Sequence, residues 1–381
     1  MANSTHGFES FIGVDLHKET VTLVAVDPSG NQIDRLKIST KCVERIDTWI
    51  RNLPGPKWMA VEAVGFVEWF IERFRGSVDR IDIADATRLA SQRGKRRKTD
   101  RNDALDPAQR LARGDCPLGY SADDQLMQLR KLGRHWRQLS RTICRAKHCM
   151  RWILLAANIR GPKLNAASAH RWLLAHGHLL KEAQRNAFAN FLDIIALIER
   201  QRETLRRQII TANKAPRFIE EIKILQSVPG IMHIWACIIL AEIGEFDRFP
   251  NADALEFWAG ITADVEESAG RDKSGQNITK AGSATLRWAL CKAAITLCRS
   301  DVKQEAIRQR LIKRVGKPKA NVAMGRRLLR TLYAMMRDGK CYQMGQPTNH
   351  QAAANKARRA RKAKVRPGNI RMDLMVTAKE F

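Results

Sequence analysis

Four acidic residues in the first third of the chain have the types and spacing of a phosphoryl-transfer site. Asp15 follows the apolar run 11–14 inside a predicted strand, and Glu62 ends a second predicted strand. Asp100 and Asp103 are three residues apart, which places them on one face of a predicted helix. Carboxylate oxygens suit Mg²⁺, and a pair of ions can stabilise the attacking and leaving oxygens of a phosphodiester. These acids therefore predict Mg²⁺ (or Mn²⁺) as the cofactor.

Each acid also has a structural interpretation when it is taken alone. Asp15 could pair with His17, Lys18 or a nearby Arg, Asp100 could cap a helix, and Asp103 could support its second turn. The combination is more specific, because a dense run of basic side chains directly precedes the acidic pair. Acids held amid such positive charge fit a site where phosphate and metal meet. We therefore expect nucleic-acid contacts from Arg96, Arg97, Lys98 and Arg101.

A second reactive group is predicted in a Gly-containing loop of the last third. Ser268 and Ser274 both lie in this loop, and neighbouring cations could stabilise the charge of a pentavalent phosphorus transition state. Composition alone favours phosphate contact without chemistry. Under either interpretation, the nucleic-acid-binding side chains expected here are Arg271, Lys273, Lys280 and Arg287.

The turn 225–231, which contains Pro229-Gly230, precedes an apolar helix and has two interpretations. It could be a helix–hairpin–helix turn that offers backbone N–H groups to a phosphate, or a plain connection between helices. The sequence does not decide between them.

The charge of the chain points to a polyanionic partner. Sixty-seven Lys and Arg against 39 Asp and Glu give a net charge of +28 over 381 residues, and phosphate backbones relieve such repulsion by counterion release. The longest apolar run, 234–241, is far shorter than the ~20 residues of a membrane span. The first residues show neither a basic start nor an apolar stretch, so we expect no secretory signal and no membrane partner.

The eight cysteines show no CxxC pair and lie in apolar or basic sequence, which predicts reduced cytosolic thiols. Cys144, His148 and Cys149 lie close together on a predicted helix. A zinc site would need a fourth ligand that the sequence does not reveal, so we favour plain thiols beside a surface histidine.

The elements that must position these groups divide the chain into four predicted parts. Residues 1–118 alternate apolar strands and helices, which indicates an α/β domain. Two apolar runs within 11–38, joined by the turn 27–30, are followed by a helix over 41–52, a strand over 57–62, a helix over 67–74 and a strand over 79–84.

Residues 119–215 contain two long helical patterns, over 122–159 and 179–213, which suit an antiparallel hairpin or a coiled-coil contact to another chain. Residues 216–345 are mostly helical, and residues 346–381 form a basic tail that we expect to be disordered.

With these elements in place, the sequence resembles a known family. The strings Gly13–Lys18 (GVDLHK) and Lys98–Ala104 (KTDRNDA), with Glu62 between them, are similar to those of the DEDD transposases of insertion sequence family 110. The resemblance implies an RNase-H-like, RuvC-like N-terminal domain whose four acids bind divalent metal. By motif match these acids are Asp15, Glu62, Asp100 and Asp103.

The last third resembles the helical transposase domain of the same family. The order Pro-Gly-Ile, Arg-Phe, Ala-Gly-Ile, Ser-x-Gly and Ile-Thr-Lys-x-Gly is shared, and there a serine becomes covalently linked to DNA. Ser268 occupies the matching position. The chain departs from the family pattern at Trp258, Ala263 and Ala269, so Ser274 stays a rival nucleophile.

The resemblance implies a transposase or recombinase of a mobile element, which cuts and rejoins DNA through a serine-linked intermediate. Its implied partners are double-stranded donor and target DNA, a structured guide RNA encoded by the element, and further copies of the chain in a dimer or tetramer. Its implied location is the bacterial cytoplasm, at the nucleoid. Two alternatives stay open: a metal-only nuclease of the Holliday-junction-resolvase type, and a non-catalytic nucleic-acid-binding protein.

Overall fold

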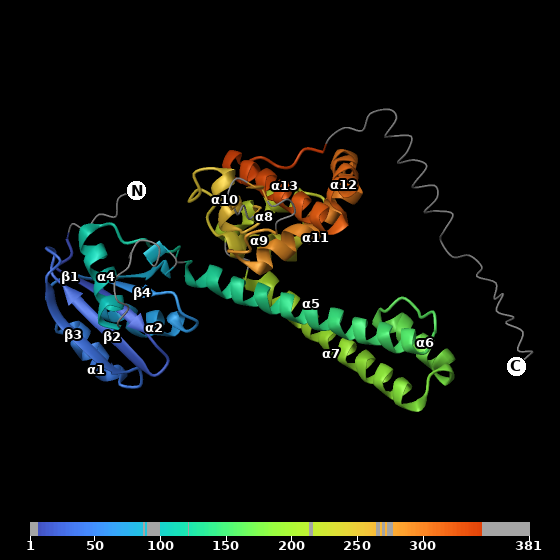
Figure 1. Ribbon diagram of the computed structural model, residues 1–381, viewed down its shortest axis with the longest axis horizontal. Coiled ribbons are helices and arrows are strands. Elements are labelled where there is room, and N and C mark those ends of the chain that lie inside the picture. Colours follow the sequence, from blue (N-terminus) through green and yellow to red (C-terminus); the bar gives the residue numbers. More distant parts are fainter. Residues whose placement is uncertain are drawn as a thin grey trace, which may run out of the picture. The chain divides into compact units, whose positions relative to one another are not determined.

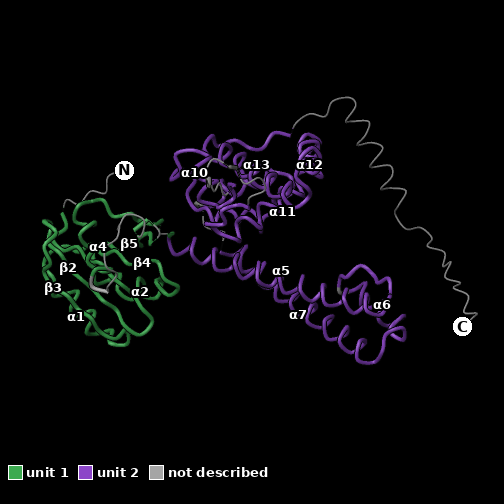
Figure 2. Tube along the Cα trace, viewed as in Figure 1, with its two compact units in different colours: residues 1–122 green, residues 123–381 purple. Residues whose placement is uncertain are grey.

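The chain divides into two compact units, Met1–Ala122 and Asp123–Phe381 (Figure 2). In this computed structural model the describable residues are 7–86, 88–89, 100–120, 122–212, 216–263, 267–268, 271–272 and 277–344. The basic tail expected over 346–381 lies outside them. Each unit has its own core and is described by itself.

The first unit is a five-stranded mixed sheet with helices on both faces (Figure 1). The strand order is β3-β2-β1-β4-β5. β1 pairs antiparallel with β2 and parallel with β4, β2 pairs antiparallel with β3, and β4 pairs parallel with β5. The bounds are β1 Ser10–Leu16, β2 Thr20–Val26, β3 Gln32–Ser39, β4 Lys57–Glu62 and β5 Arg80–Ala84. This α/β domain confirms the predicted fold class, and its topology is that expected of an RNase-H-like domain.

Two separate apolar cores cover the two faces of this sheet. Ile12, Val14 and Leu16 pack on one face with α1 (Val43–Arg51) and α2 (Val67–Phe74). Phe11, Trp58 and Ala60 pack on the other face with α4 (Asp100–Arg113). β1 and β4 are therefore covered on both faces, which explains their nearly continuous apolar sequence.

The first apolar stretch forms two strands where the sequence pattern indicated one. The chain reverses direction in a tight turn at His17, Lys18 and Glu19, where the His17 N–H donates to the Thr20 carbonyl at 2.9 Å. β1 and β2 therefore pair as a hairpin, and β3 follows the predicted turn at Asp27–Gly30, where the Gly30 N–H donates to the Asp27 carbonyl. The sequence pattern did not predict two strands here, because only three polar residues interrupt a long apolar run.

The second unit begins with a long antiparallel helical hairpin. α5 (Asp124–Ala156) packs along α7 (Glu182–Ala212), with α6 (Ala166–His176) and the 3₁₀ turn η2 (Gly177–Leu179) near its tip (Figure 1). Met150 and Leu154 meet Phe188, Leu192 and Ile195 in its core. The hairpin interpretation of this region therefore holds within one chain.

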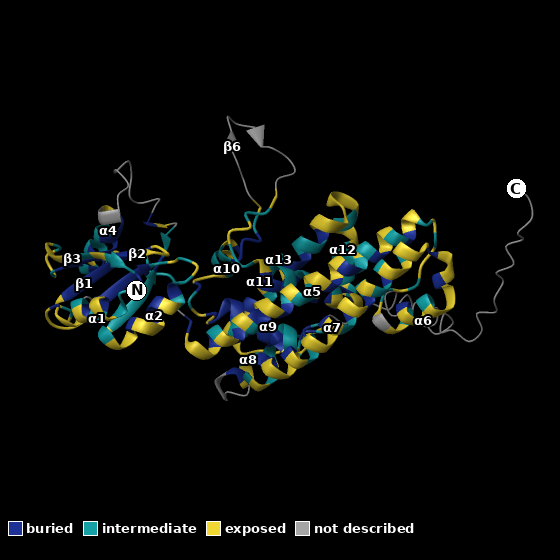
Figure 3. Ribbon diagram, turned by 90° about the horizontal axis from the view of Figure 1, so that it is seen from below, coloured by how far each residue is buried: buried dark blue, intermediate teal, exposed yellow. Residues whose placement is uncertain are grey.

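A helical bundle completes the second unit and packs against α5. Its innermost helix, α9 (His233–Ile243), is buried from Ala236 to its end, as the dark blue ribbon in Figure 3 shows. No helix in the described part of the chain is long and apolar enough to cross a bilayer. The other elements are α8 Pro216–Gln226, α10 Ala252–Trp258, β6 Glu267–Ser268, β7 Arg271–Asp272, α11 Ala284–Ser300, α12 Val302–Val315 and α13 Lys317–Asp338.

Candidate active site

Asp15 lies between two strands at one end of the first unit's sheet. On one side it pairs with Thr22 of β2. On the other side, the parallel register joins Gly13 to Ala60 and Val14 to Val61, the residues that directly precede Asp15 and Glu62. Side chains alternate along a strand, so Asp15 and Glu62 share the face that carries Phe11, Trp58 and Ala60. This is the face that α4 covers.

Gly13 sets the position of α4 on that face. A Cβ built on Gly13 would lie 1.9 Å from the Ala104 carbonyl oxygen and 2.8 Å from the Ala108 nitrogen. The helix backbone therefore lies directly on the strand, which only a glycine permits. At the other end of the helix, Gln109 Nε2 donates to the Gly30 carbonyl at 3.1 Å, beside the β2–β3 turn. α4 thus begins near the Asp15 end of β1 and runs toward the Phe11 end.

This direction brings the first turn of α4 to the carboxylates of the sheet. Asp103 directly precedes Ala104 and is 9% exposed, while Asp15 is 5% exposed. Asp100 is the first residue of the helix, and Asp100 and Asp103 both belong to it, as the sequence predicted. The side chains of Asp100 and Arg101 are outside the described part. So are Arg96, Arg97 and Lys98, for which the expected contacts stay predictions.

Asp15 has a local partner in His17. The two side chains are 3.1 Å apart, between His17 Nε2 and Asp15 Oδ2, and the histidine ring is 57% exposed. This pairing was the structural interpretation of Asp15 in the sequence. An exposed histidine leaves the site open to solvent on that side.

The donor set fits a divalent metal by its chemistry. Mg²⁺ and Mn²⁺ prefer oxygen ligands, and the acids at this face and end of the sheet supply only carboxylate oxygens. These acids are Asp15, Glu62 and Asp103. Among the described side chains, no three of Asp, Glu, His and Cys come together as an ion site. The side chains of Asp15, Glu62 and Asp103 therefore do not form an ion site by themselves, and the fourth candidate, Asp100, has no described side chain.

Ser268 ends β6, the first strand of a small antiparallel ribbon. It pairs with Arg271 of β7, and Glu267 pairs with Asp272. A backbone bridge between Ala263 and Ile278 closes the base of this segment. The side chains of Ser268 and Arg271 lie outside the described part, as do Lys273 and Ser274 entirely. The choice between Ser268 and Ser274 therefore stays a prediction.

We call the ribbon of β6 and β7, which carries Ser268, the serine ribbon. At its base, the backbone at Gly260 packs tightly against the backbone at Ala281 and Gly282. A Cβ on Gly260 would lie 2.6 Å from the amide nitrogens of Ala281 and Gly282, and Gly260 has φ +64°. Arg287 Nη1 donates to the Ala259 carbonyl at 3.0 Å and to the Gly282 carbonyl at 2.6 Å. Burial lowers the pKa of Arg287, and the charge of Arg137 lowers it further. The guanidinium of Arg287 thus anchors the ribbon to α11.

Lys280 lies at the same base and is exposed. Its backbone has φ +56°, a conformation uncommon for a residue with a side chain. The Lys280 N–H donates to the Gly260 carbonyl at 3.1 Å, which holds the residue in place. Its ammonium is therefore presented to solvent from a fixed backbone.

The Pro-Gly turn connects α8 and α9 and packs against α11. Gly230 has φ +101°, and a Cβ there would lie 2.7 Å from Thr296 Cβ. This close packing accounts for the glycine without any phosphate contact, and the helix–hairpin–helix interpretation stays a prediction. Burial lowers the pKa of His233, the first residue of α9, which disfavours a charged ring at this helix start.

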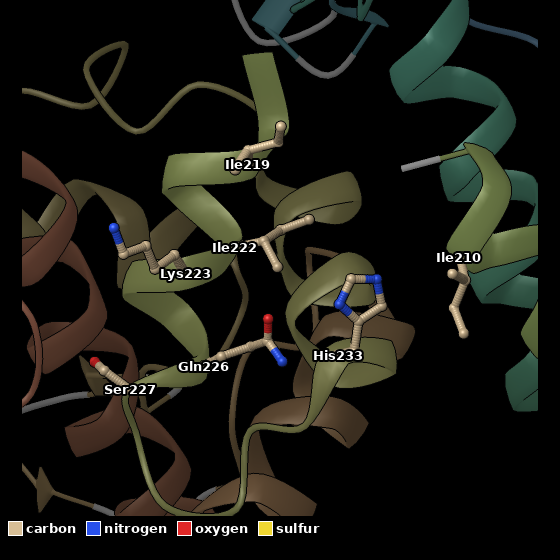
Figure 4. A pocket seen from close by; sticks show the side chains of 7 residues that line it. All are labelled: Ile210, Ile219, Ile222, Lys223, Gln226, Ser227 and His233. Atoms are coloured by element: carbon tan, nitrogen blue, oxygen red, sulfur yellow. The ribbon is translucent and has the colours of Figure 1, made fainter. Parts of the chain in front are cut away.

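Beside this turn is a cavity of about 880 Å³ that contains none of the predicted site residues (Figure 4). It lies between the end of α7 and the helices α8 and α9. Its lining is Ile210, Ile219, Ile222, Lys223, Gln226, Ser227 and His233.

The cysteines are free thiols, as the sequence predicted. Cys144 and His148 are exposed and Cys149 is half-buried, and no zinc set forms among the described side chains. Burial raises the pKa of Cys116 and of Cys237 to about 12, so both remain neutral thiols in the core.

Sequence reasoning overlooked Gly13, although a signal was present. A glycine inside a buried apolar strand commonly marks the close approach of another backbone. Gly13 lies two residues before Asp15 on the same face, so it could have indicated that the helix carrying Asp100 and Asp103 crosses there.

Comparisons with known proteins match the two regions of the chain that carry these groups. A family model described as a transposase, DEDD type of IS110, matches residues 12–159. A second model, described as the transposase IS116/IS110/IS902 family, matches residues 222–309. The first match contains the four acids and the second contains the serine ribbon.

One curated relative is an uncharacterised 43.6 kDa protein of insertion element IS110 from Streptomyces coelicolor. It is 27% identical over 162 residues, which are 42% of this chain and 39% of the relative. The aligned part thus spans well under half of the relative's length.

Proposed function

This chain belongs to the IS110 family of DEDD transposases, and from that premise we propose that it is the transposase or recombinase of a mobile element. It cuts and rejoins DNA through an intermediate in which a serine is linked to the strand. The observation that supports the proposal is the contact of α4 with Gly13, because it lays the helix that carries Asp103 on the sheet face that holds Asp15 and Glu62.

The covalent step uses the hydroxyl of Ser268. Its oxygen attacks the phosphorus of a phosphodiester, and the new O–P bond forms as the bond from phosphorus to one deoxyribose oxygen breaks. The serine proton ends on the released oxygen, which becomes a free hydroxyl. Attack of a hydroxyl from another strand on the serine phosphodiester reverses these changes and rejoins DNA without an external energy source. Lys280 is a cation available to the phosphate at the base of the ribbon.

We assign Asp15, Glu62, Asp100 and Asp103 to the binding of Mg²⁺ or Mn²⁺. The chemistry supplied by such an ion is polarisation of the scissile phosphate. The residues themselves keep the site anionic and rigid: Asp15 is fixed in β1, and Asp103 is fixed by the packing of α4 on Gly13.

The proposal includes the partners implied by the family. Donor and target duplexes supply the scissile phosphates, and a structured guide RNA encoded by the element pairs with them. The reaction needs groups from both compact units, so a dimer or tetramer in which chains share an active site is part of the proposal. The net charge of +28 suits a protein that holds several polyanions at once. The site of action is the bacterial cytoplasm, at the nucleoid.

The test is the formation of a covalent protein–DNA adduct. Protein is incubated with Mg²⁺, labelled duplex spanning the ends of the element, and RNA transcribed from the adjoining noncoding DNA. A denaturing gel should show a slow band of protein-linked DNA with the natural chain and none with Ser268→Ala. Ser300→Ala is the matched control, because Ser300 is an exposed serine at the end of α11.

The other outcomes separate the remaining possibilities. An adduct that persists in Ser268→Ala shows that Ser268 is not the nucleophile, and Ser274→Ala is then the variant to examine. Cleavage that needs Mg²⁺ but never gives an adduct indicates a metal-only nuclease of the resolvase type. Salt-dependent binding without any cleavage indicates a non-catalytic nucleic-acid-binding protein.

A further inference from the structure

A large groove in the second unit is lined by tryptophans and cations, and its lining includes none of the predicted catalytic or nucleic-acid-binding residues. It has a volume of about 940 Å³ and lies between α5, α7, α9 and α11. We call it the tryptophan groove, after Trp136 of α5, Trp235 of α9 and Trp288 of α11. Trp288 directly follows Arg287, which anchors the serine ribbon.

The charge of the tryptophan groove is strongly positive. The residues that line it include no Asp or Glu, and the cations among them are Arg141, Arg145, Lys147, Arg202 and Lys292. In the part of the chain that the structure describes, none of these five forms an ion pair within 4.0 Å. Burial lowers the pKa of Arg202, and the charge of Glu199, three residues earlier, acts in the opposite direction. The groove therefore offers an anion several cations that protein acids do not neutralise.

The aromatic rings give this groove a second property. Trp235 and Trp288 meet edge to face, with ring centroids 4.9 Å apart and planes at 62°. Both side chains are half-buried, so part of each remains accessible. Trp136 is 8% exposed and lies beneath Arg202, whose Cζ is 4.3 Å from the ring centroid. Indole faces beside cations are the combination that binds unpaired bases and their phosphates.

Arg202 also carries an unsatisfied donor. Its Nε is buried and has no hydrogen-bond partner, and burial lowers the pKa of its guanidinium. A buried donor without an acceptor is costly. A phosphate oxygen entering the groove would supply the missing acceptor and the missing negative charge.

Residues outside the lining of the groove fix the position of α5 relative to α9 and so keep the groove in its shape. Arg134 of α5 makes a bidentate ion pair with Glu242 of α9, at 2.9 and 3.1 Å. Gly133 lets α5 approach Ile238 of α9, because a Cβ there would lie 3.1 Å from that side chain. A preformed groove costs little ordering free energy when a ligand binds.

We propose that the tryptophan groove binds an unpaired stretch of nucleic acid, with bases stacked on Trp235 and Trp288 and phosphates held by Arg202, Arg141 and Lys292. This rests on the proposed function, because it assigns a path for one of the strands that such an enzyme handles. A duplex does not suit the groove, since its bases are already stacked inside the helix. A second copy of this chain does not suit it either, since that copy would bring like charge.

The experiment measures binding of short labelled oligonucleotides to the full chain by fluorescence anisotropy. The probes are a single-stranded DNA, the RNA of the same sequence, and the matching DNA duplex. Trp235→Leu should weaken single-strand binding about 5- to 100-fold, the range expected for loss of one stacked base. Trp235→Phe keeps a ring and should restore most of the affinity. Duplex binding should be nearly unchanged in both variants.

Charge reversal gives an independent arm with a matched control. The groove variant combines Arg141→Glu with Lys292→Glu and reverses the charge of two exposed cations of the groove. The control variant combines Arg171→Glu with Lys313→Glu and makes the same charge change at exposed sites on α6 and α12. We expect a much larger loss of single-strand affinity in the groove pair than in the control pair. Thermal unfolding of each variant checks that the bundle is intact.

A photocrosslink locates the strand. A single strand that carries 5-bromouracil should crosslink to Trp235 or Trp288, as identified by mass spectrometry of the peptides. A loss confined to the RNA or to the DNA probe supports the proposal and identifies which strand occupies the groove. Equal losses on single strand and duplex, no loss with either single strand, or crosslinks only elsewhere would overturn it. None of these results depends on adduct formation, so the groove can fail while the proposed function stands.

Discussion

Asp15 and Asp103 are carboxylates that the fold of the first unit buries almost completely. Burial of a charged carboxylate costs free energy unless a cation or hydrogen bonds compensate it. His17 pairs with Asp15, and this histidine is largely exposed and is charged only when protonated. A bound divalent ion would compensate both acids at once.

This reasoning predicts how metal acts on stability. Saturating Mg²⁺ or Mn²⁺ should raise the melting temperature of the natural chain, and ion at 100 times its dissociation constant corresponds to about 2.7 kcal/mol. Asp15→Asn and Asp103→Asn should each abolish most of this increase, because each removes a charged ligand. The measurement is thermal unfolding with metal and with chelator.

The control for this prediction is Glu44→Gln, which changes an exposed acid on α1 and should leave the metal effect intact. The comparison is between shifts, because loss of a buried charge can itself alter the melting temperature. If both aspartate variants kept the full shift, the assignment of these acids to metal would be wrong.

At the scale of elements, the contact of α4 with β1 decides whether the acids meet. Ala104 and Ala108 present small side chains and bare backbone to Gly13, so helix and strand touch directly. The acids of α4 depend on this contact for their position.

Gly13→Ala should therefore loosen α4 and lower the free energy of unfolding by about 1–3 kcal/mol, as overpacking commonly does. The inserted methyl would meet the Ala104 carbonyl, which is backbone and can move only with the helix. Urea unfolding measures the loss, and the metal-dependent shift should weaken as well. Gly76→Ala is the matched control, because nothing lies within 4 Å of its Cβ position. Equal stability of the two variants would contradict the close contact.

The elements themselves were largely predictable, because each depends on a short stretch of sequence. β4 and α2 have the predicted bounds of 57–62 and 67–74, where apolar residues follow the strand and helix periods. The face that α4 covers was not predictable. It depends on the pairing of β1 with β4, which joins residues more than 40 positions apart. The tryptophan groove was missed for the same reason, since its three rings come from three helices distant in sequence.

Tyr342, near the end of the described chain, ties that end to the helical bundle. Its backbone N–H donates to Ser227 Oγ at 2.8 Å, and its hydroxyl donates to Asp301 Oδ2 at 2.7 Å. Asp301 also caps α12 through the N–H groups of Lys303 and Gln304. Burial and the Asp301 charge raise the pKa of Tyr342 to about 12.

This raised pKa predicts a dependence of stability on alkaline pH. The folded chain favours the protonated phenol, so its contribution is full below the ordinary pKa of about 10 and is lost as the pH rises through about 12. Tyr342→Phe should lower the free energy of unfolding by about 1 kcal/mol at pH 8. The difference between variant and natural chain should shrink by pH 11. Urea unfolding at both pH values checks this, and a constant difference would contradict the hydrogen bond to Asp301.

At the scale of the whole molecule, the positive charge is spread over parts with different proposed tasks. Lys280 lies at the serine ribbon, and five cations line the tryptophan groove: Arg141, Arg145, Lys147, Arg202 and Lys292. Residues 345–381, beyond the described part, add nine Lys and Arg against two Asp and Glu. Like charges in such a segment favour contact with phosphates of any sequence.

Truncation after Met344 should therefore weaken DNA binding without changing its sequence preference. Each phosphate contact on duplex DNA adds about 0.9 to the slope of log affinity against log salt concentration. Loss of the nine basic residues should reduce that slope by several, and by at most about eight. The cations of the groove and the ribbon remain, so binding itself should persist. A variant with the order of residues 345–381 shuffled is the control, because counterion release depends on charge and not on sequence. A truncated chain with the natural slope would show that this segment makes no phosphate contacts. A shuffled chain with the truncated slope would show that the segment acts through a specific structure and not through its charge.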